Sequence, residues 1–174
     1  MASSLLPEIT NSYNIYNKAE KMLGVSGEIE LSELEALTET IEASGVLGEF
    51  EDPATGQFSS LKMKIPFAVL YEDVFDLMNT TEPVQLTLRQ SVQVIDPKTG
   101  ATDYQPIRIV VRGKATTTSL GKVAKGKKME SEVELEIIYI KIQINNKTKL
   151  ELDKLNFKFV LNGKDMLKKI RKQI

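Results

Sequence analysis

The sequence predicts a mainly β fold, an antiparallel sandwich or barrel with one flanking helix, and three observations carry this prediction. Residues 130–144 alternate polar and apolar side chains with a period of two, which is typical of an extended strand. Residues 84–95 and 105–114 alternate in the same way on either side of the turn sequence DPKTG at 96–100, which predicts a hairpin. A convincing helical pattern is confined to residues 70–79, so strands are expected to supply most of the core.

The N-terminal part of the chain reads as short strands followed by a long loop. Residues 13–16 and 25–31 predict the arms of a hairpin that turns near residues 17–20, and residues 37–43 predict a further strand. Residues 45–60 (GVLGEFEDPATGQFSS) are rich in turn formers and predict a long surface loop. A loop of this length in a compact domain is commonly functional or ordered by a partner.

A strand and then the one helix follow this loop. Residues 61–67 alternate apolar and polar side chains. Residues 70–79 place four apolar side chains on one stripe, and Glu72 and Asp73 lie in the first turn, where the helix dipole favours negative charge. Pro83 lies just beyond this segment and agrees with a helix that ends before it.

The C-terminal part is predicted to hold the last strands and a basic tail. After Ile144 the chain turns at residues 145–147, residues 155–161 supply a last strand, and residues 164–174 form a basic helical tail. The length suits a single domain over residues 1–174. Its segments of special interest are an N-terminal arm at 1–24, the long loop at 45–60 and the basic C-terminal tail at 162–174.

The composition argues against most enzyme chemistry. The 174 residues include no cysteine and no histidine, which removes thiolate nucleophiles, imidazole bases and nearly every zinc, copper or haem site. The 24 acidic residues show no spacing that singles out a catalytic carboxylate pair. We therefore expect no enzyme activity, no metal and no cofactor.

The sequence also gives no sign of a membrane protein. No apolar run approaches the ~20 residues that a membrane-spanning helix needs. The start, MASSLLPEIT, lacks the basic segment and long apolar core of a signal peptide. We expect a soluble protein that is synthesised in the cytoplasm and has no membrane partner.

Charge is strongly polarised along the chain. Residues 1–87 carry 4 basic against 15 acidic residues, a net charge of −11, whereas residues 88–174 carry 19 against 9, a net charge of +10. Such polarity can be satisfied within one folded chain or can drive head-to-tail association between copies. Composition alone leaves both possibilities open.

The strand at 130–144 combines a row of glutamates with a change of phase at Ile137–Ile138. Apolar side chains occupy odd positions up to 137 and even positions from 138 onward. This pattern predicts a β-bulge, or a strand that buries first one face and then the other. The row is either a solvated strand face or a functional acidic surface. It consists of Glu130, Glu132, Glu134 and Glu136.

Residues 121–128 (GKVAKGKK) nearly match a phosphate-binding loop. Lys128 stands where the motif needs Ser or Thr, and a strand follows in place of the required helix. Few aromatic side chains lie nearby for base stacking, and the glutamates that follow repel phosphate. The sequence therefore predicts a flexible basic hairpin loop that is solvated or contacts an acidic neighbour.

Ordered sequence blocks from about Ile9 to the C-terminus give a more specific signal. They are LGVSGEIEL at 23–31, LTETIEASGVLGE at 37–49, PATGQF at 53–58, IVVRGK at 109–114, SLGK at 119–122, YIKI at 139–142, LELDKLN at 150–156 and NGKDML at 162–167. Their order and spacing agree with the predicted strands. In these blocks the chain resembles the major tail tube proteins of contractile-tailed phages and phage-tail-like bacteriocins.

The resemblance implies a structural protein whose hexameric rings stack into a hollow tube inside a contractile sheath. Strands would pair between neighbours in each ring and close a continuous barrel around the lumen. The implied location is the tail tube of a virion or a phage-tail-like particle. The implied partners are further copies of the chain, the tail sheath protein, the baseplate and tape-measure proteins, and DNA that passes non-specifically through a phage lumen, or ions in a bacteriocin.

Two sets of residues are candidates for the surfaces of such a tube. The lumen-facing candidates are the glutamate row Glu130, Glu132, Glu134 and Glu136, and the polar strand face Gln85, Thr87, Arg89, Ser91 and Gln93. The candidates for contacts between rings are Glu49, Glu51, Asp52, Phe58, Lys122, Lys125, Lys127, Lys128, Lys168, Lys169 and Arg171. Two alternative functions stay open, a secretion-system tube protein and a monomeric β-sandwich ligand-binding module.

Overall fold

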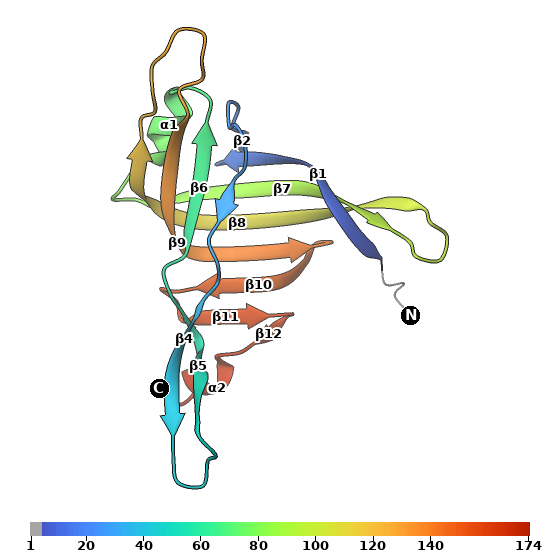
Figure 1. The fold of residues 1–174 in the computed structure, drawn as a ribbon, viewed down its shortest axis with the longest axis vertical. Helices are drawn as coiled ribbons and strands as arrows, with labels where there is room; N and C mark the ends of the chain where they lie inside the picture. The colour runs from blue at the N-terminus through green and yellow to red at the C-terminus, as the bar shows by residue number, and fades with distance from the viewer. Residues whose placement is uncertain (1–4) are drawn as a thin grey trace.

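The structure is a computed structural model that describes residues 5–174, and it confirms a mainly β, antiparallel fold (Figure 1). Ten strands form one sheet, and β4 and β5 form a separate two-stranded sheet. The strands are β1 (Leu6–Asn17), β2 (Glu20–Lys21), β3 (Glu30–Leu31), β4 (Ala36–Glu42), β5 (Glu49–Phe58), β6 (Lys62–Phe67), β7 (Val84–Ile95), β8 (Thr102–Ser119), β9 (Ser131–Ile144), β10 (Lys147–Asp153), β11 (Lys158–Leu161) and β12 (Lys164–Asp165). The helices are α1 (Glu72–Leu77) and α2 (Lys168–Arg171).

The ten-stranded sheet folds over into two layers, because β8 and β9 take part in both. Residues 139–144 of β9 pair with β10, whereas residues 131–136 pair with β6. The narrow layer consists of β3, β6, the start of β9 and the end of β8. The wide layer consists of the remaining parts of β8 and β9 together with β1, β2, β7, β10, β11 and β12. In Figure 1 the strands of the narrow layer run along the longest axis of the molecule and those of the wide layer run across it.

The phase change predicted within β9 is confirmed as a β-bulge. Arg112 of β8 pairs with Tyr139, and the next residue, Gly113, pairs with Ile137, so Ile138 is the extra residue of the bulge. Val133, Leu135 and Ile137 are buried before the bulge, and Ile140 is buried after it. Both halves of β9 therefore bury their apolar side chains in the same core, although they belong to different layers.

The core lies between the two layers and includes one face of α1. The alternation predicted in β6 and β7 is confirmed, since Met63, Ile65 and Phe67 are completely buried, as is Leu86 of β7. The apolar stripe predicted for the helix is confirmed in part: Val74 and Leu77 are completely buried, but α1 is shorter than residues 70–79. Each fully buried side chain of this size stabilises the fold by about 1.5–3 kcal/mol.

The N-terminal hairpin is only partly as predicted. Its turn is correct: Lys18 and Ala19 have φ values of 47° and 71°, the left-handed geometry of a two-residue hairpin turn. The prediction that residues 25–31 form its second arm is wrong, because this tight turn places β2 directly opposite the end of β1. Residues 25–31 instead join the narrow layer, through a bridge from Val25 to Phe67 and through β3. Residues 1–4 of the predicted arm lie outside the described part of the chain.

The prediction of a long loop at residues 45–60 is wrong, because most of these residues form β5. β5 pairs with β4 in a hairpin, leaving a short connection at residues 43–48. The turn formers Pro53 and Gly56 obscured this strand. Proline has no backbone N–H to donate, and this is tolerated in a two-stranded sheet because each strand has one edge that pairs with no other strand. The hairpin projects from the layers at one end of the long axis (Figure 1).

The C-terminal part differs from its prediction in three elements. The turn after β9 is confirmed, but it leads into β10, which the prediction omitted although Leu150 and Leu152 alternate there with Lys149 and Glu151. The last predicted strand shortens to β11, and the tail folds into β12 and the second helix, α2. Part of this tail is anchored, since Leu167 is 2 % exposed.

Candidate functional site

Three of the four glutamates in the predicted row share the outward face of the narrow layer. Glu132, Glu134 and Glu136 alternate with buried residues along β9. The prediction that Glu130 continues this strand is wrong. Glu130 precedes β9 with a φ of 55°, because the chain leaves the basic loop there before the ladder begins.

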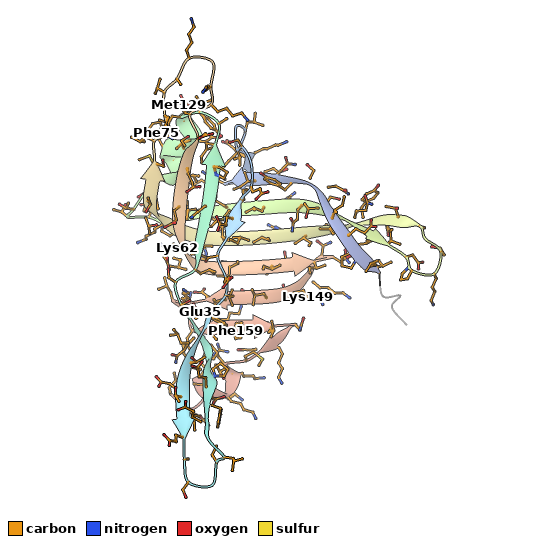
Figure 2. All side chains as sticks on the ribbon, viewed as in Figure 1. Glu35, Lys62, Phe75, Met129, Lys149 and Phe159 are labelled. Carbon is orange, nitrogen blue, oxygen red and sulfur yellow. The ribbon has the colours of Figure 1, made fainter. Side chains whose placement is uncertain are left out.

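Cations and hydroxyls of neighbouring strands contact this glutamate face. The Lys62 Nζ donates to the Glu134 carboxylate at 2.9 Å, and the Thr116 hydroxyl donates to it at 3.2 Å. The Ser60 hydroxyl donates to the Glu136 carboxylate at 2.6 Å. The hydrogen bond from Lys62 lowers the pKa of Glu134 and outweighs the opposing effect of burial, so this carboxylate is charged at neutral pH. Figure 2 shows Lys62 on this layer.

The outward face of the narrow layer therefore carries rows of alternating charge. Lys62 and Lys64 of β6 lie in register with Glu136 and Glu134 of β9, and Lys64 Nζ lies 3.9 Å from the Glu30 carboxylate of β3. The pairing of these glutamates with lysines was not predicted from the sequence. The alternation of Lys62 and Lys64 in the predicted strand at 61–67 was the available signal.

The narrow layer has an open strand edge on each side. The pairing of β7 with β8 ends at Gly113, so within residues 5–174 no strand pairs with the other side of β8 at residues 114–119. On the opposite side, the Val25–Phe67 bridge, β3, and the hydrogen bonds from the Ser26 N–H to the Pro66 carbonyl and from the Ser32 N–H to the Lys62 carbonyl, both 2.9 Å, place residues 25–32 along β6. In the described part of the chain no strand pairs with the outer side of β3, so β3 is the edge on that side. Open edges present unpaired backbone groups that another chain can extend.

The second lumen candidate, the polar face of β7, lies on the outward side of the wide layer. Gln85, Thr87, Arg89, Ser91 and Gln93 share this face, opposite the apolar side of the strand. The Arg89 guanidinium lies 5.2 Å from the Tyr16 ring centroid. The Gln93 amide donates to the Glu8 carboxylate at 2.7 Å.

A half-buried polar cluster on β8, β9 and β10 extends this wide-layer face. The Arg112 guanidinium lies 4.2 Å from the Tyr139 ring centroid and 3.5 Å from the Asp153 carboxylate. The Tyr139 hydroxyl donates to the Glu151 carboxylate at 3.1 Å. Burial, with a smaller contribution from the Glu151 charge, raises the pKa of Tyr139 to about 12. These interactions fix the side chains of this face to one another.

The acidic candidates for contacts between rings lie on the projecting hairpin. Glu49, Glu51 and Asp52 are exposed on β5. Phe58, at the base of the hairpin, is half-buried and packs edge-on against Phe159 of β11, with ring centroids 5.1 Å apart. Phe58 thus helps to anchor the hairpin to its own chain.

The basic candidates lie in two different places. Lys122, Lys125, Lys127 and Lys128 are exposed in the loop between β8 and β9, at the opposite end of the long axis from the hairpin (Figure 1). Figure 2 shows Met129, near the end of this loop, at that end of the molecule, whereas Glu35 lies toward the hairpin. Lys168, Lys169 and Arg171 lie on α2, where Arg171 bonds the Asp165 carboxylate and donates to the Phe157 carbonyl at 3.0 Å.

These surfaces offer polar and charged groups for contact with other molecules. Within residues 5–174, no group of three or more acidic side chains is arranged to hold a metal ion. Over the same residues, no helix is both long enough and apolar enough to cross a membrane.

Comparison with known proteins identifies the family. The search of curated proteins found no match. The family model described as phage tail tube protein FII matches residues 7–174, nearly the whole chain. This match accords with the mainly β, antiparallel fold and with a structural role in a virion tail, where copies of the chain assemble with one another and with other tail proteins. The chain belongs to the phage tail tube protein FII family.

Proposed function

We propose that the chain forms the inner tube of a contractile phage tail, or of a phage-tail-like particle, by stacking hexameric rings into a hollow conduit. The observation that carries this proposal is the narrow layer, which is polar outside, apolar inside and open at both strand edges. Pairing these edges between neighbours in a ring closes a barrel and leaves the narrow layer without an open edge. The role is structural, with no catalytic step.

The glutamate face of the narrow layer is our first candidate for the lumen wall. Strands of a closed barrel tilt by roughly 35–45° from the barrel axis, so they run more along a tube than across it. The narrow layer runs along the longest axis, whose two ends carry the acidic hairpin and the basic loop (Figure 1). We take this axis as the tube axis, which makes the narrow layer the better candidate than the polar face of β7.

A wall of this kind suits a conduit for DNA. Glu132, Glu134 and Glu136 present carboxylates that repel phosphate, while Lys62 and Lys64 keep the repulsion weak. DNA would then pass without binding in a phage, and ions would pass in a bacteriocin. The tail sheath would cover the outside of the tube, and baseplate and tape-measure proteins would meet its end and its lumen during assembly in the host cytoplasm.

Assembly of the purified chain tests this proposal. We expect light scattering to rise with protein concentration and negative-stain microscopy to show rings or tubes, because open edges of neighbouring copies pair. Far-UV circular dichroism on the same sample verifies that the chain is folded. A folded chain that stays monomeric at every concentration would contradict the proposal and favour a monomeric β-sandwich ligand-binding module.

A further inference from the structure

The β4–β5 hairpin projects from the core and has few contacts with its own chain. It forms a separate two-stranded sheet, and such a hairpin is marginally stable in water without further packing. Leu37 and Phe50 are each 48 % exposed, and Leu47 at the tip is completely exposed. The base is held by the contact of Phe58 with Phe159 and by Leu167, which lies so close to Gly56 that a Cβ atom there would be 2.8 Å from its side chain. The tip and the middle of the hairpin therefore present apolar surface for a partner.

The hairpin also carries negative charge that a positively charged partner would neutralise. Residues 36–58 contain five acidic residues and no lysine or arginine. The strand register places Glu39 directly opposite Asp52 and Glu42 directly opposite Glu49. Like charges in these positions destabilise a strand pair. In the described part of the chain no cation forms an ion pair with these four carboxylates.

The basic loop at the opposite end has the complementary character. Its four lysines are exposed, and Val123 among them is 90 % exposed. The backbone of the loop is held by hydrogen bonds from the Lys122 N–H to the Met129 carbonyl at 2.7 Å and from the Met129 N–H to the Ala68 carbonyl at 2.8 Å. In the part of the chain that the structure describes, no carboxylate pairs with these lysines. The four lysines are Lys122, Lys125, Lys127 and Lys128.

We infer that the acidic β4–β5 hairpin of one copy docks on the basic loop, residues 120–130, of a second copy in the next ring. Opposite charge and exposed apolar side chains on both surfaces support this pairing. The two surfaces lie at opposite ends of the long axis (Figure 1). Contact between them is therefore heterologous, and it propagates as a head-to-tail stack that gives the tube a direction. The inference rests on the proposed tube function and names the surfaces that join its rings.

Charge reversal of each surface tests the inference. The hairpin variant carries Glu49→Lys and Glu51→Lys, and the loop variant carries Lys125→Glu and Lys127→Glu. We expect each variant alone to give at least tenfold fewer tubes than the wild type in negative-stain images, because like charges then face each other between rings. An equimolar mixture should recover tubes, since each hairpin then meets a loop of opposite charge on the other variant. A chain that carries all four substitutions should recover them as well.

A matched control separates this effect from a change in net charge. Lys147→Glu with Lys149→Glu changes the net charge as the loop variant does, but on β10, and should assemble like the wild type. Circular dichroism verifies that every variant is folded. The inference would be overturned if the wild type forms tubes and the hairpin and loop variants assemble equally well. It would also be overturned if the two variants form no tubes when they are mixed. Either result would leave the proposed tube function unchanged. A wild type that forms no tubes would instead refute the tube function itself.

Discussion

Gly113→Val is expected to lower the free energy of unfolding by about 3 kcal/mol, a large part of the stability of a domain of this size. Gly113 lies where β8 passes from the wide layer to the narrow layer, beside the bulge in β9. A Cβ atom at this position would lie 2.4 Å from the Glu136 carbonyl oxygen, a distance that no side chain tolerates without movement of the backbone. The substitution therefore separates the two strands that connect the layers.

Urea unfolding followed by circular dichroism measures this effect. Thr117→Val, on the exposed part of the same strand, is a suitable control, because an exposed β-branched residue replaces another and the stability should change by less than about 0.5 kcal/mol. If Gly113→Val unfolds at the same urea concentration as the wild type, the β8 and β9 backbones do not pack as closely at Gly113 as the structure shows.

Asp153→Ala is expected to lower the free energy of unfolding by about 2 kcal/mol at neutral pH, because it removes the charged acceptor of three hydrogen bonds. Asp153 is 8 % exposed and ends β10. Its carboxylate accepts hydrogen bonds from the Leu155 N–H at 3.2 Å, the Asn156 N–H at 3.1 Å and the Asn156 amide at 2.7 Å, and Arg112 lies beside it. These bonds fix the turn into β11.

The charge of Asp153 makes part of this stability depend on pH. Burial raises the pKa of Asp153, but hydrogen bonds from Asn156 and the positive charge of Arg112 outweigh it and hold the pKa below its usual 3.8. The charged form is thus favoured in the folded state, and its contribution is fully present above pH 3.8 and lost as the pH falls through the folded pKa. We expect the stability difference between the wild type and Asp153→Asn, measured by urea unfolding, to shrink below pH 3.8. A difference that stays constant to the lowest pH would refute this role of the charge.

Strands with a clear two-residue period could be predicted from the sequence because one of their faces is buried. The bulge at Ile138 was visible for the same reason, since both halves of β9 must place apolar side chains in one core. The reason why β8 can pass from one layer to the other at this point could not be predicted from the sequence. The need for glycine at position 113 arises from the approach of the β9 backbone, which only the folded chain defines.

The β4–β5 hairpin could not be predicted because it lacks the buried face from which periodicity arises. Most of its residues are exposed, so apolar and polar side chains do not alternate clearly, and Pro53 and Gly56 read as turn formers. β10 is different, because Leu150 and Leu152 carried a signal that the prediction overlooked.

The candidate surfaces could be predicted only in part. Periodicity was enough to place Glu132, Glu134 and Glu136 on one face of a strand. Their partners depend on which strand lies alongside, so the pairing of Glu134 with Lys62 emerged only from the sheet order. The placement of the acidic hairpin and the basic loop at opposite ends likewise depends on the fold (Figure 1).

Cryo-electron microscopy of assembled tubes tests the central claim most directly, namely that the narrow layer closes around the lumen. The prediction is a helical stack of hexameric rings in which Glu132, Glu134 and Glu136 line the channel, and in which β6 and residues 131–136 of β9 run more along the tube axis than across it. A reconstruction that places these three glutamates on the outer wall, or that shows the polar face of β7 lining the channel, would contradict the claim.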